Sequence, residues 1–449
     1  MKKHLVLSLA LAAFSAFAAD TPRRAVAVIS IDGMHPDCVL KADEHELRIP
    51  NLRRLLRDGA HASAVRGVLP TVTYPSHTTM LTGVWPARHG IYANETFDPL
   101  RKNQSGWYWY AEDIQSPTLW QAAAKAGYVV GSISWPVSVG APGVQFNIPE
   151  YWRAQTTEDL KLLRAISTPG LVAEFQKTVG EYTLDLDAAE AGDWDRTRYA
   201  IAMIQKKRVR FLTLHLAAFD HVEHSHGPFS PRAMQALEEI DRMVGQIETA
   251  LRAEDPRAAI LVVSDHGFAA VDHQLNLNVA FVDAGLITLK EGNAGIADWK
   301  AQPWIQAGSA AIILKDPKDD ATRAKIDEVL HRLARDPNNG IEQVLDRKAI
   351  GDLGGMPNAA FWVDMKPNFA IGGALTGPLA RAVTLRGTHG YSPTHPELQA
   401  SFFLLAPDVR KGLDLGAIDM RSVAPTIAHL LGIPFPSAEL KPLPIDSRP

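Results

Sequence analysis

The stretch Ala259-Ile-Leu-Val-Val-Ser264 runs directly into Asp265 and His266. Its short run of aliphatic and β-branched residues predicts a strand that is buried on both faces, as the strands of parallel sheets are. Runs of the same character occur elsewhere in the chain and predict further buried parallel strands. They are Ala25–Ile31, Tyr128–Ser134, Phe211–Leu216 and Ser401–Leu405.

Amphipathic segments separate these predicted strands, and their apolar spacing is typical of helices with one buried face. The alternation predicts an α/β fold with a mostly parallel central sheet and helices on both faces. Residues 147–191 and 276–384 fit the alternation poorly, and we predict that they are cap-like insertions. The first should be helical or irregular, and the second should hold loops, a helix and weak strands. The helical segments are Thr118–Ala126, Asp193–Lys206, Arg232–Arg252 and Ala321–Arg335.

Carboxylate and imidazole side chains follow several of the predicted strands. Asp32 ends the first run, Asp220 follows Phe211–Leu216 closely, and Asp265-His266 follows Ala259–Ser264. Ligands gather at the carboxyl ends of the strands in open α/β sheets, and Asp and His are ligands that suit zinc. Asp220 and His224 are four residues apart, which places both on one face of a helical turn. The pattern therefore predicts a metal site at one edge of the sheet.

The stretch Pro70-Thr-Val-Thr-Tyr-Pro75 places Thr73 at the start of a predicted helix. Pro75 suits the first helical turn, where a missing N–H is harmless, so Thr73 should lie at or just before the helix N-terminus. The partial positive charge of the helix end and a nearby metal ion would both stabilise its alkoxide. A threonine at this position also suits a simple helix cap, so position alone leaves both roles open.

The beginning of the chain has the pattern of a secretory signal peptide. Lys2 and Lys3 precede the apolar stretch Leu5–Ala18, which ends in an Ala-x-Ala cleavage pattern. We expect residues 1–18 to be the signal and residues 19–449 to form one large domain. The apolar stretch is too short to span a bilayer comfortably, so we expect a periplasmic or secreted protein without a membrane anchor.

Composition narrows the class of protein further. The chain of 449 residues is 46% hydrophobic and 21% charged, as an ordinary globular enzyme is. A net charge of -4 gives no indication of a nucleic-acid partner. The single Cys38 excludes a disulfide within the chain, and we expect it to be a packed, unreactive residue.

Taken in order, the motifs resemble those of the nucleotide pyrophosphatase/phosphodiesterase family, within the alkaline phosphatase superfamily. The resemblance covers nearly all of the chain after the predicted signal and implies an alkaline-phosphatase-like fold. It rests on Ser30–Met34, Pro70–Pro75, His89–Asn94, Ser134–Pro136, Asp220–Pro228, Ser264–Gly267 and Gly387–Tyr391.

The resemblance also implies the chemistry of the site. It implies two Zn²⁺ per chain, one held by Asp220, His224 and His389, the other by Asp32, Asp265, His266 and the Thr73 hydroxyl. Thr73 would be the catalytic nucleophile, and Asn94 a donor to a non-bridging phosphoryl oxygen. We expect a two-step displacement through a threonyl-phosphate, with the two cations neutralising the entering and leaving oxygens. His77, His89, His221 and His226 match no ligand position and are expected to be supporting groups, whereas His215 carries no interpretable pattern.

The substrate class is indicated by the neighbours of these residues. Tyr74, Trp107 and Trp109 lie where the family binds a nucleobase, and aromatic faces suit bases or choline. The segment Ser132–Val137 has no basic residue where related phosphomonoesterases carry Lys and Arg, which favours a monoanionic diester over a dianionic monoester. We therefore expect a hydrolase of small phosphodiesters or phosphoanhydrides, with a nucleotide as the expected substrate.

The sequence disfavours one other function and leaves two open. A sulfatase is disfavoured because Thr73 is followed by Tyr74-Pro75 instead of the sulfatase motif. A phosphomonoesterase that holds its dianion by another route stays open, as does a catalytically silent metal-binding relative. A lipid-derived diester remains an alternative substrate, and the sequence does not indicate an oligomeric state.

Overall fold

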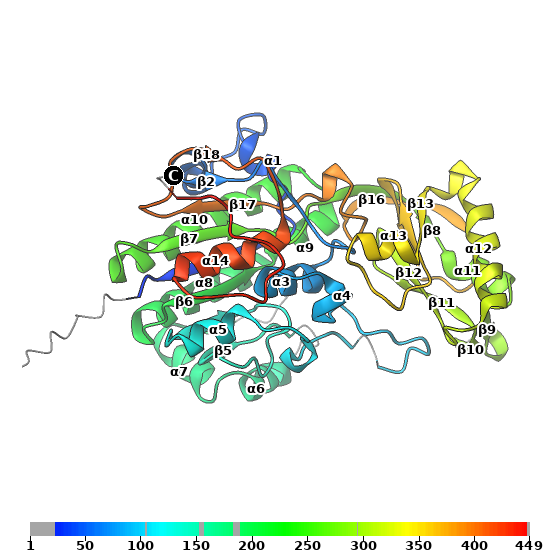
Figure 1. Cartoon of the computed structure of the whole chain (residues 1–449), viewed down its shortest axis with the longest axis horizontal. Coiled ribbons are helices and arrows are strands. Elements are labelled where there is room, and N and C mark those ends of the chain that lie inside the picture. The colour runs from blue at the N-terminus through cyan, green and yellow to red at the C-terminus, as the bar shows by residue number, and fades with distance from the viewer. Residues whose placement is uncertain (1–22, 104–105, 152–156, 183–188, 294, 447–449) are drawn as a thin grey trace, which may run out of the picture.

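The computed structural model describes residues 23–446 except 104–105, 152–156, 183–188 and 294, so the predicted signal peptide lies outside the described residues. Within the described part, eight strands form a central sheet in the order β18-β2-β17-β7-β1-β6-β4-β5 (Figure 1). All five predicted strands belong to this sheet, which confirms their type. The strands are β1 Val26–Ile31, β2 Ala60–His61, β4 Val130–Ile133, β5 Phe146–Ile148, β6 Phe211–Leu216, β7 Ala259–Val263, β17 Phe402–Leu405 and β18 Leu413–Asp414.

The middle of the sheet is parallel, as predicted. Strand β1 pairs in parallel with β6 and β7, and β4 pairs in parallel with β6 and β5. The prediction of a parallel strand at Ser401–Leu405 is wrong, because β17 pairs antiparallel with β7 and β2. The chain enters β17 beside the carboxyl end of β7, where the Ser264 amide donates to the Ser401 carbonyl at 3.2 Å. Strand β17 can therefore only run back against β7.

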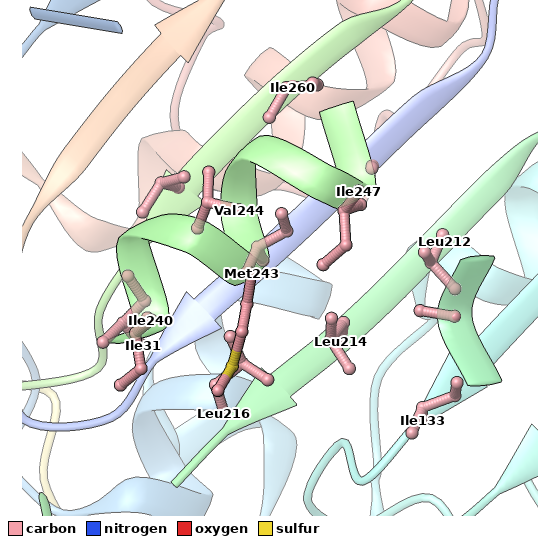
Figure 2. Close-up of a cluster of buried hydrophobic side chains, with 14 of the residues drawn as sticks. Ile31, Ile133, Leu212, Leu214, Leu216, Ile240, Met243, Val244, Ile247 and Ile260 are labelled. Atoms are coloured by element: carbon pink, nitrogen blue, oxygen red, sulfur yellow. The ribbon is translucent and has the colours of Figure 1, made fainter. Parts of the chain in front are cut away.

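Helices cover both faces of the sheet, which confirms the predicted architecture. Along β1, Ile29 and Ile31 pack with one set of helices, whereas Val26 and Val28 pack with the other. Figure 2 shows α10 on the first face, where Met243 and Val244 lie over the aliphatic side chains of β1, β6 and β7. Burial of each such side chain contributes about 1.5–3 kcal/mol. The helices are α1 Asp37–Leu40, α2 Pro50–Asp58, α8 Ala189–Lys206, α9 Ala218–His226 and α10 Pro231–Glu254 on the first face, and α3 Thr73–Thr82, α5 Leu119–Lys125 and α14 Val423–Leu431 on the second.

Residues 276–384 belong to a second lobe, at the right of Figure 1, that is more regular than the predicted loops and weak strands. Its antiparallel sheet has the order β11-β12-β14-β13, and beside it lies a smaller sheet of order β15-β8-β16. Helix α12 (Asp320–Ala334) contributes Ile326 and Leu330 to the core of this lobe. The strands are β8 Ala269–Leu275, β9 Ile287–Leu289, β10 Ile296–Trp299, β11 Ala301–Ile305, β12 Ser309–Leu314, β13 Ile341–Asp346, β14 Phe361–Met365, β15 Asn368–Ile371 and β16 Ala380–Thr388.

The other predicted insertion, 147–191, is largely helical where it is described. It contains α6 (Thr157–Ile166) and α7 (Leu171–Thr178), although β5 at its start completes the central sheet. The remaining short α-helices and strands are α4 Pro86–His89, α11 Leu277–Asp283, α13 Arg347–Asp352, β3 Ala64–Arg66 and β19 Ala417–Asp419. In the part of the chain that the structure describes, no helix has the length and apolar character needed to cross a membrane.

Candidate active site

Two neighbouring parallel strands bring the first group of candidate ligands together. Strands β1 and β7 pair with Ser30 opposite Val263, so the residues that follow each strand meet at one edge of the sheet. One ligand atom from each of Asp32, Asp265 and His266 lies within 4.8 Å of the others. The Gly33 amide donates to Asp265 Oδ1 at 3.1 Å and fixes that carboxylate. We call Asp32, Asp265 and His266 the Asp32 group.

The second group, Asp220, His224 and His389, combines a helix of the first lobe with a strand end of the second. Asp220 and His224 lie one turn apart on α9, as predicted, and His389 directly follows β16. Their ligand atoms also lie within 4.8 Å of one another. The Nδ1 atoms of His224 and His389 lie 3.2 Å from the carbonyls of Gly387 and Thr71, respectively. Donation from Nδ1 leaves Nε2 with a free lone pair, the state in which imidazole binds a metal. We call this set the Asp220 group.

The two groups adjoin each other and Thr73. The rings of His266 and His389, one from each group, stack with centroids 3.8 Å apart and planes at 12°. Thr73 is the first residue of α3, which confirms its predicted place at a helix N-terminus. Its Oγ1 atom lies 3.5 Å from His266 Nε2. The structure therefore places a hydroxyl beside two carboxylate–histidine groups.

The charges of the two groups fit divalent cations. Burial, followed by repulsion from Asp265 and Asp220, holds the pKa of Asp32 well above its usual range. Among the described residues, Asp32 Oδ1, Asp265 Oδ2 and Asp220 Oδ1 are buried without a hydrogen-bond partner. Buried carboxylates without partners are strongly disfavoured, and a cation between them would reverse that penalty. The mixed oxygen and nitrogen donors of both groups suit Zn²⁺.

Two buried side chains, His215 and Glu150, support the Asp32 group: His215 contacts Asp32, and Glu150 contacts His215. His215 Nε2 lies 2.9 Å from Asp32 Oδ2, and His215 Nδ1 lies 2.6 Å from Glu150 Oε2. Burial lowers the pKa of His215, but Glu150 and Asp32 outweigh burial and hold that pKa well above its usual value. The sequence reading missed both His215 and Glu150. A histidine inside the predicted buried strand Phe211–Leu216 was the available signal, because a buried imidazole needs hydrogen-bond partners.

The other histidines divide into buried and exposed ones. His77 Nδ1 lies 2.8 Å from the Thr73 carbonyl and Nε2 lies 2.9 Å from Ser30 Oγ, so His77 supports the start of α3 as predicted. Burial, followed by the charge of His215, lowers the pKa of His77 to about 3, so it is neutral there. His89 is buried and bonded to Thr79. His221 and His226 are exposed, and the supporting role predicted for them is wrong because their side chains leave α9 toward solvent.

Asn94 and His389 both line a cavity of about 540 Å³. Its Oδ1 atom accepts from the Tyr74 amide at 2.8 Å, which leaves the amide nitrogen as the free end of the side chain. Of the three predicted aromatic residues, Trp107 lines this cavity. Tyr74 is 0% exposed beneath Trp107 and Trp109, whose rings lie 5.2 and 6.2 Å from its own. We call this space the Asn94 cavity.

Fold and site together define an α/β protein with paired carboxylate–histidine groups beside a helix-terminal threonine. The chain belongs to the type I phosphodiesterase/nucleotide pyrophosphatase family, whose sequence model matches residues 26–392. This match confirms the family that the motifs indicated. It supports a hydrolase that acts on phosphoric esters, and it is consistent with the metal-binding residue groups described above.

Known relatives and solved structures agree with this assignment. The human ectonucleotide pyrophosphatase/phosphodiesterase family member 5 is 22% identical over 461 aligned positions, covering 96% of this chain and 80% of the relative. Family member 1 of Mus musculus is 24% identical over 230 positions, covering 49% of this chain but only 21% of its own length.

A murine member 5 structure, of an inactive threonine-to-alanine variant in complex with AMP, has a TM-score of 0.65 at 21% identity and covers 94% of this chain and 97% of its own. The human member 5 structure has a TM-score of 0.63 at 20% identity, covering 92% of this chain and 96% of its own. These matches confirm the alkaline-phosphatase-like fold.

Proposed function

We propose that the protein is an exported, two-zinc phosphodiesterase and nucleotide pyrophosphatase that acts through a threonyl-phosphate intermediate. The observation that carries the proposal is the position of Thr73, whose hydroxyl lies at a helix N-terminus and 3.5 Å from His266, in the Asp32 group. Family membership supports the class of reaction. Export rests on the pattern of residues 1–18 alone.

The proposed roles follow from the contacts of each residue. The Asp32 group with the Thr73 hydroxyl would hold one zinc ion, and the Asp220 group the other. When bound, the two ions supply positive charge to the entering and leaving oxygens. Thr73 Oγ1 attacks phosphorus as the bond to the leaving-group oxygen breaks, and the threonine proton passes through solvent to that oxygen; water then attacks the threonyl-phosphate, which releases the phosphorylated product and restores the Thr73 hydroxyl. The helix N-terminus stabilises the negative charge on Oγ1, and His77 holds the Thr73 backbone through the carbonyl.

Asn94 is proposed to stabilise charge on the phosphoryl group. The bond from the Tyr74 amide fixes Asn94 Oδ1, so Nδ2 can donate to a non-bridging oxygen in the cavity. Trp107 would contact the rest of the substrate, whereas Tyr74 and Trp109 would form the wall that holds Trp107 in place.

A monoanionic diester is the better substrate for this site. The segment that carries cations in related phosphomonoesterases is here uncharged and buried, with the Trp135 ring 4.8 Å from that of His77. Arg101 is the cation among the described residues that line the Asn94 cavity, and its guanidinium donates to the Gly373 carbonyl at 3.0 Å. A phosphate dianion would therefore lack a dedicated partner. The AMP bound to the murine relative supports a nucleotide as the substrate.

The test compares zinc-loaded wild type with Thr73→Ala and, as a matched control, Thr249→Ala on the surface of α10. We expect release of p-nitrophenol from bis(p-nitrophenyl) phosphate to fall by more than about 10³-fold in Thr73→Ala only. Metal content and the unfolding temperature of Thr73→Ala should stay near those of wild type. Equal activity in all three proteins would refute the role of Thr73.

Two further results separate the alternatives. Wild type that binds zinc but hydrolyses no diester would be a silent relative. A strong preference for p-nitrophenyl phosphate, a monoester, would instead indicate a phosphomonoesterase and overturn the interpretation of the Trp135 segment.

A further inference from the structure

A second cavity, of about 610 Å³, adjoins the Asp220 group. His224 lines this cavity, whereas His389 of the same group lines the Asn94 cavity, and Ala307 lines both. The side chain of His224 is 40% exposed and that of His389 is 8% exposed, so His224 is the more open of the two. The two cavities therefore meet at the Asp220 group. We call the second one the Arg386 cavity, after the arginine in its lining.

Arg386 is held close to the Asp220 group by the path of β16. His224 Nδ1 lies 3.2 Å from the carbonyl of Gly387, the residue directly after Arg386. At Gly387 the strand approaches α9 so closely that a Cβ there would lie 2.5 Å from the Glu223 carbonyl oxygen. Arg386 lies opposite Val271 of β8 in the antiparallel pair. The backbone of Arg386 is therefore positioned by β8 and by the contact of β16 with α9.

The guanidinium of Arg386 is available to a ligand. The residue is exposed, and within the described part of the chain no hydrogen bond or ion pair engages it. Arg381 on the same strand differs, because it donates to Gln274 Oε1 at 2.8 Å. Among the described residues that line the Arg386 cavity, Arg386 is the permanently charged one and none is acidic, whereas Glu95 and Asp98 line the Asn94 cavity. A guanidinium offers N–H donors in a planar fork that fits phosphate oxygens, so the Arg386 cavity is the better of the two for an anion.

The direction of the proposed reaction leads to this cavity. Thr73 lies beside His266 of the Asp32 group, and the ring of His266 stacks on that of His389 in the Asp220 group. In phosphoryl transfer the entering and leaving oxygens lie roughly in line on opposite sides of phosphorus. A phosphoryl group attacked by Thr73 would therefore release its leaving oxygen toward the Asp220 group, where His224 lines the Arg386 cavity.

We propose that the Arg386 cavity receives the leaving group of the substrate and that Arg386 pairs with phosphate oxygens there. This inference rests on the proposed function and adds a residue that selects the substrate by the charge of its leaving group. In a nucleoside triphosphate, the bond from the α-phosphorus to the bridging oxygen breaks as Thr73 Oγ1 bonds to phosphorus and its proton passes to solvent. Pyrophosphate leaves with the bridging oxygen and the bonding electrons. Arg386 contacts this departing group and not the transferred phosphoryl group, so it favours phosphoanhydrides over esters with an uncharged leaving group.

The test compares two thymidine substrates that differ only in the leaving group. Thymidine 5′-triphosphate releases pyrophosphate, whereas thymidine 5′-p-nitrophenyl phosphate releases a group that carries no charge until the bond breaks. Arg386→Gln should lower kcat/KM for the triphosphate by roughly 5–50-fold, because it removes charge-assisted hydrogen bonds at an exposed position. It should leave the p-nitrophenyl ester within about twofold. Arg347→Gln, at an exposed arginine that begins α13 outside both cavities, is the control and should change neither rate.

The outcomes separate this inference from the proposed function. A folding defect would lower both rates together, so the ratio between the two substrates is the measurement. If Arg386→Gln leaves that ratio unchanged, or if Arg347→Gln lowers it equally, the inference is overturned and the reaction stands. Turnover of the p-nitrophenyl ester without turnover of the triphosphate in wild type would also overturn it.

Binding gives a readout that needs no turnover. Calorimetric titration of Thr73→Ala with thymidine 5′-triphosphate should show weaker binding when Arg386→Gln is added, and unchanged binding when Arg347→Gln is added instead. If wild type hydrolyses neither substrate, the proposed function fails and this titration decides alone. Binding that is absent, or equal with and without Arg386→Gln, refutes the inference.

Discussion

The buried chain Asp32–His215–Glu150 predicts that a residue outside the metal groups controls metal affinity. Glu150→Gln keeps the size of the side chain and an acceptor for His215 Nδ1. It removes the negative charge on the side of His215 that faces away from Asp32. His215 then holds Asp32 less firmly, because its own charged partner is gone. The Asp220 group makes no contact with His215 among the described residues, so it serves as an internal control.

The size of the effect follows from the contacts. A hydrogen bond to a charged group contributes about 1.5–3 kcal/mol, and the His215–Glu150 contact of 2.6 Å is short and buried. Loss of a partner behind a metal-ligating residue lowers metal affinity by about 10–100-fold, which corresponds to roughly 1.4–2.7 kcal/mol. The two estimates agree, and they predict that the affinity of the Asp32 group for a metal ion falls while that of the Asp220 group does not.

The assay is competition for zinc against a chromogenic chelator, with wild type, Glu150→Gln and the exposed control Glu112→Gln. His215→Gln and the double variant complete a mutant cycle. If Glu150 acts through His215, the loss caused by Glu150→Gln should largely disappear in the His215→Gln background. If Glu150→Gln binds zinc at both groups as tightly as wild type does, and its circular dichroism spectrum is unchanged, this reasoning is refuted. So would full additivity in the cycle.

Three further predictions concern stability and reactivity. Gly390 has φ +83°, and a Cβ there would lie 1.8 Å from the Gln306 carbonyl oxygen. Gly390→Ala should therefore destabilise the fold by more than Gly416→Ala in urea unfolding, because Gly416 has φ +67° with open space around it and carries only the backbone penalty of about 1–2 kcal/mol. Cys38 is buried, and burial raises the pKa of its thiol well above the usual value, so one thiol per chain should react with Ellman's reagent in denaturant and none in the native protein. His395 Nε2 lies 2.8 Å from Asp364 Oδ2, and although burial lowers the pKa of His395, Asp364 raises it to a net value above 6.5. The stability that this pair contributes should be full below pH 6.5 and lost as the pH rises through the raised pKa, so His395→Gln should lower the free energy of unfolding more at pH 6 than at pH 9.

Local pattern was enough to predict the centre of this fold. The apolar runs that became β1, β6 and β7 are short and bounded, and the polar residues after them could only meet at a shared strand edge. The helix that begins at Thr73 was also predictable, because Pro75 limits where it can start. The matched family model confirms the resemblance that these motifs carried.

Features that depend on contacts between distant residues were not predictable. The run at β17 has the same apolar character in either direction, and its antiparallel course depends on where Ser401 meets Ser264. The contact between His215 and Glu150 joins segments whose spacing carries no periodic signal. Composition likewise could not indicate which of Tyr74, Trp107 and Trp109 lines the Asn94 cavity. Trp107 does so, whereas Tyr74 is covered by its neighbours.

The ligands of each group come from points far apart along the chain. Asp32 meets Asp265 and His266, and Asp220 and His224 meet His389. An ion held by each set would act as a cross-link that closes a long loop, and the entropy removed from the unfolded chain grows with the length of that loop. Cys38 is the single cysteine, so disulfide bonds within the chain cannot provide such links. A chelator should therefore lower the unfolding temperature as well as the activity, because both ions would cross-link distant parts of the chain and the ion of the Asp220 group would also join the two lobes.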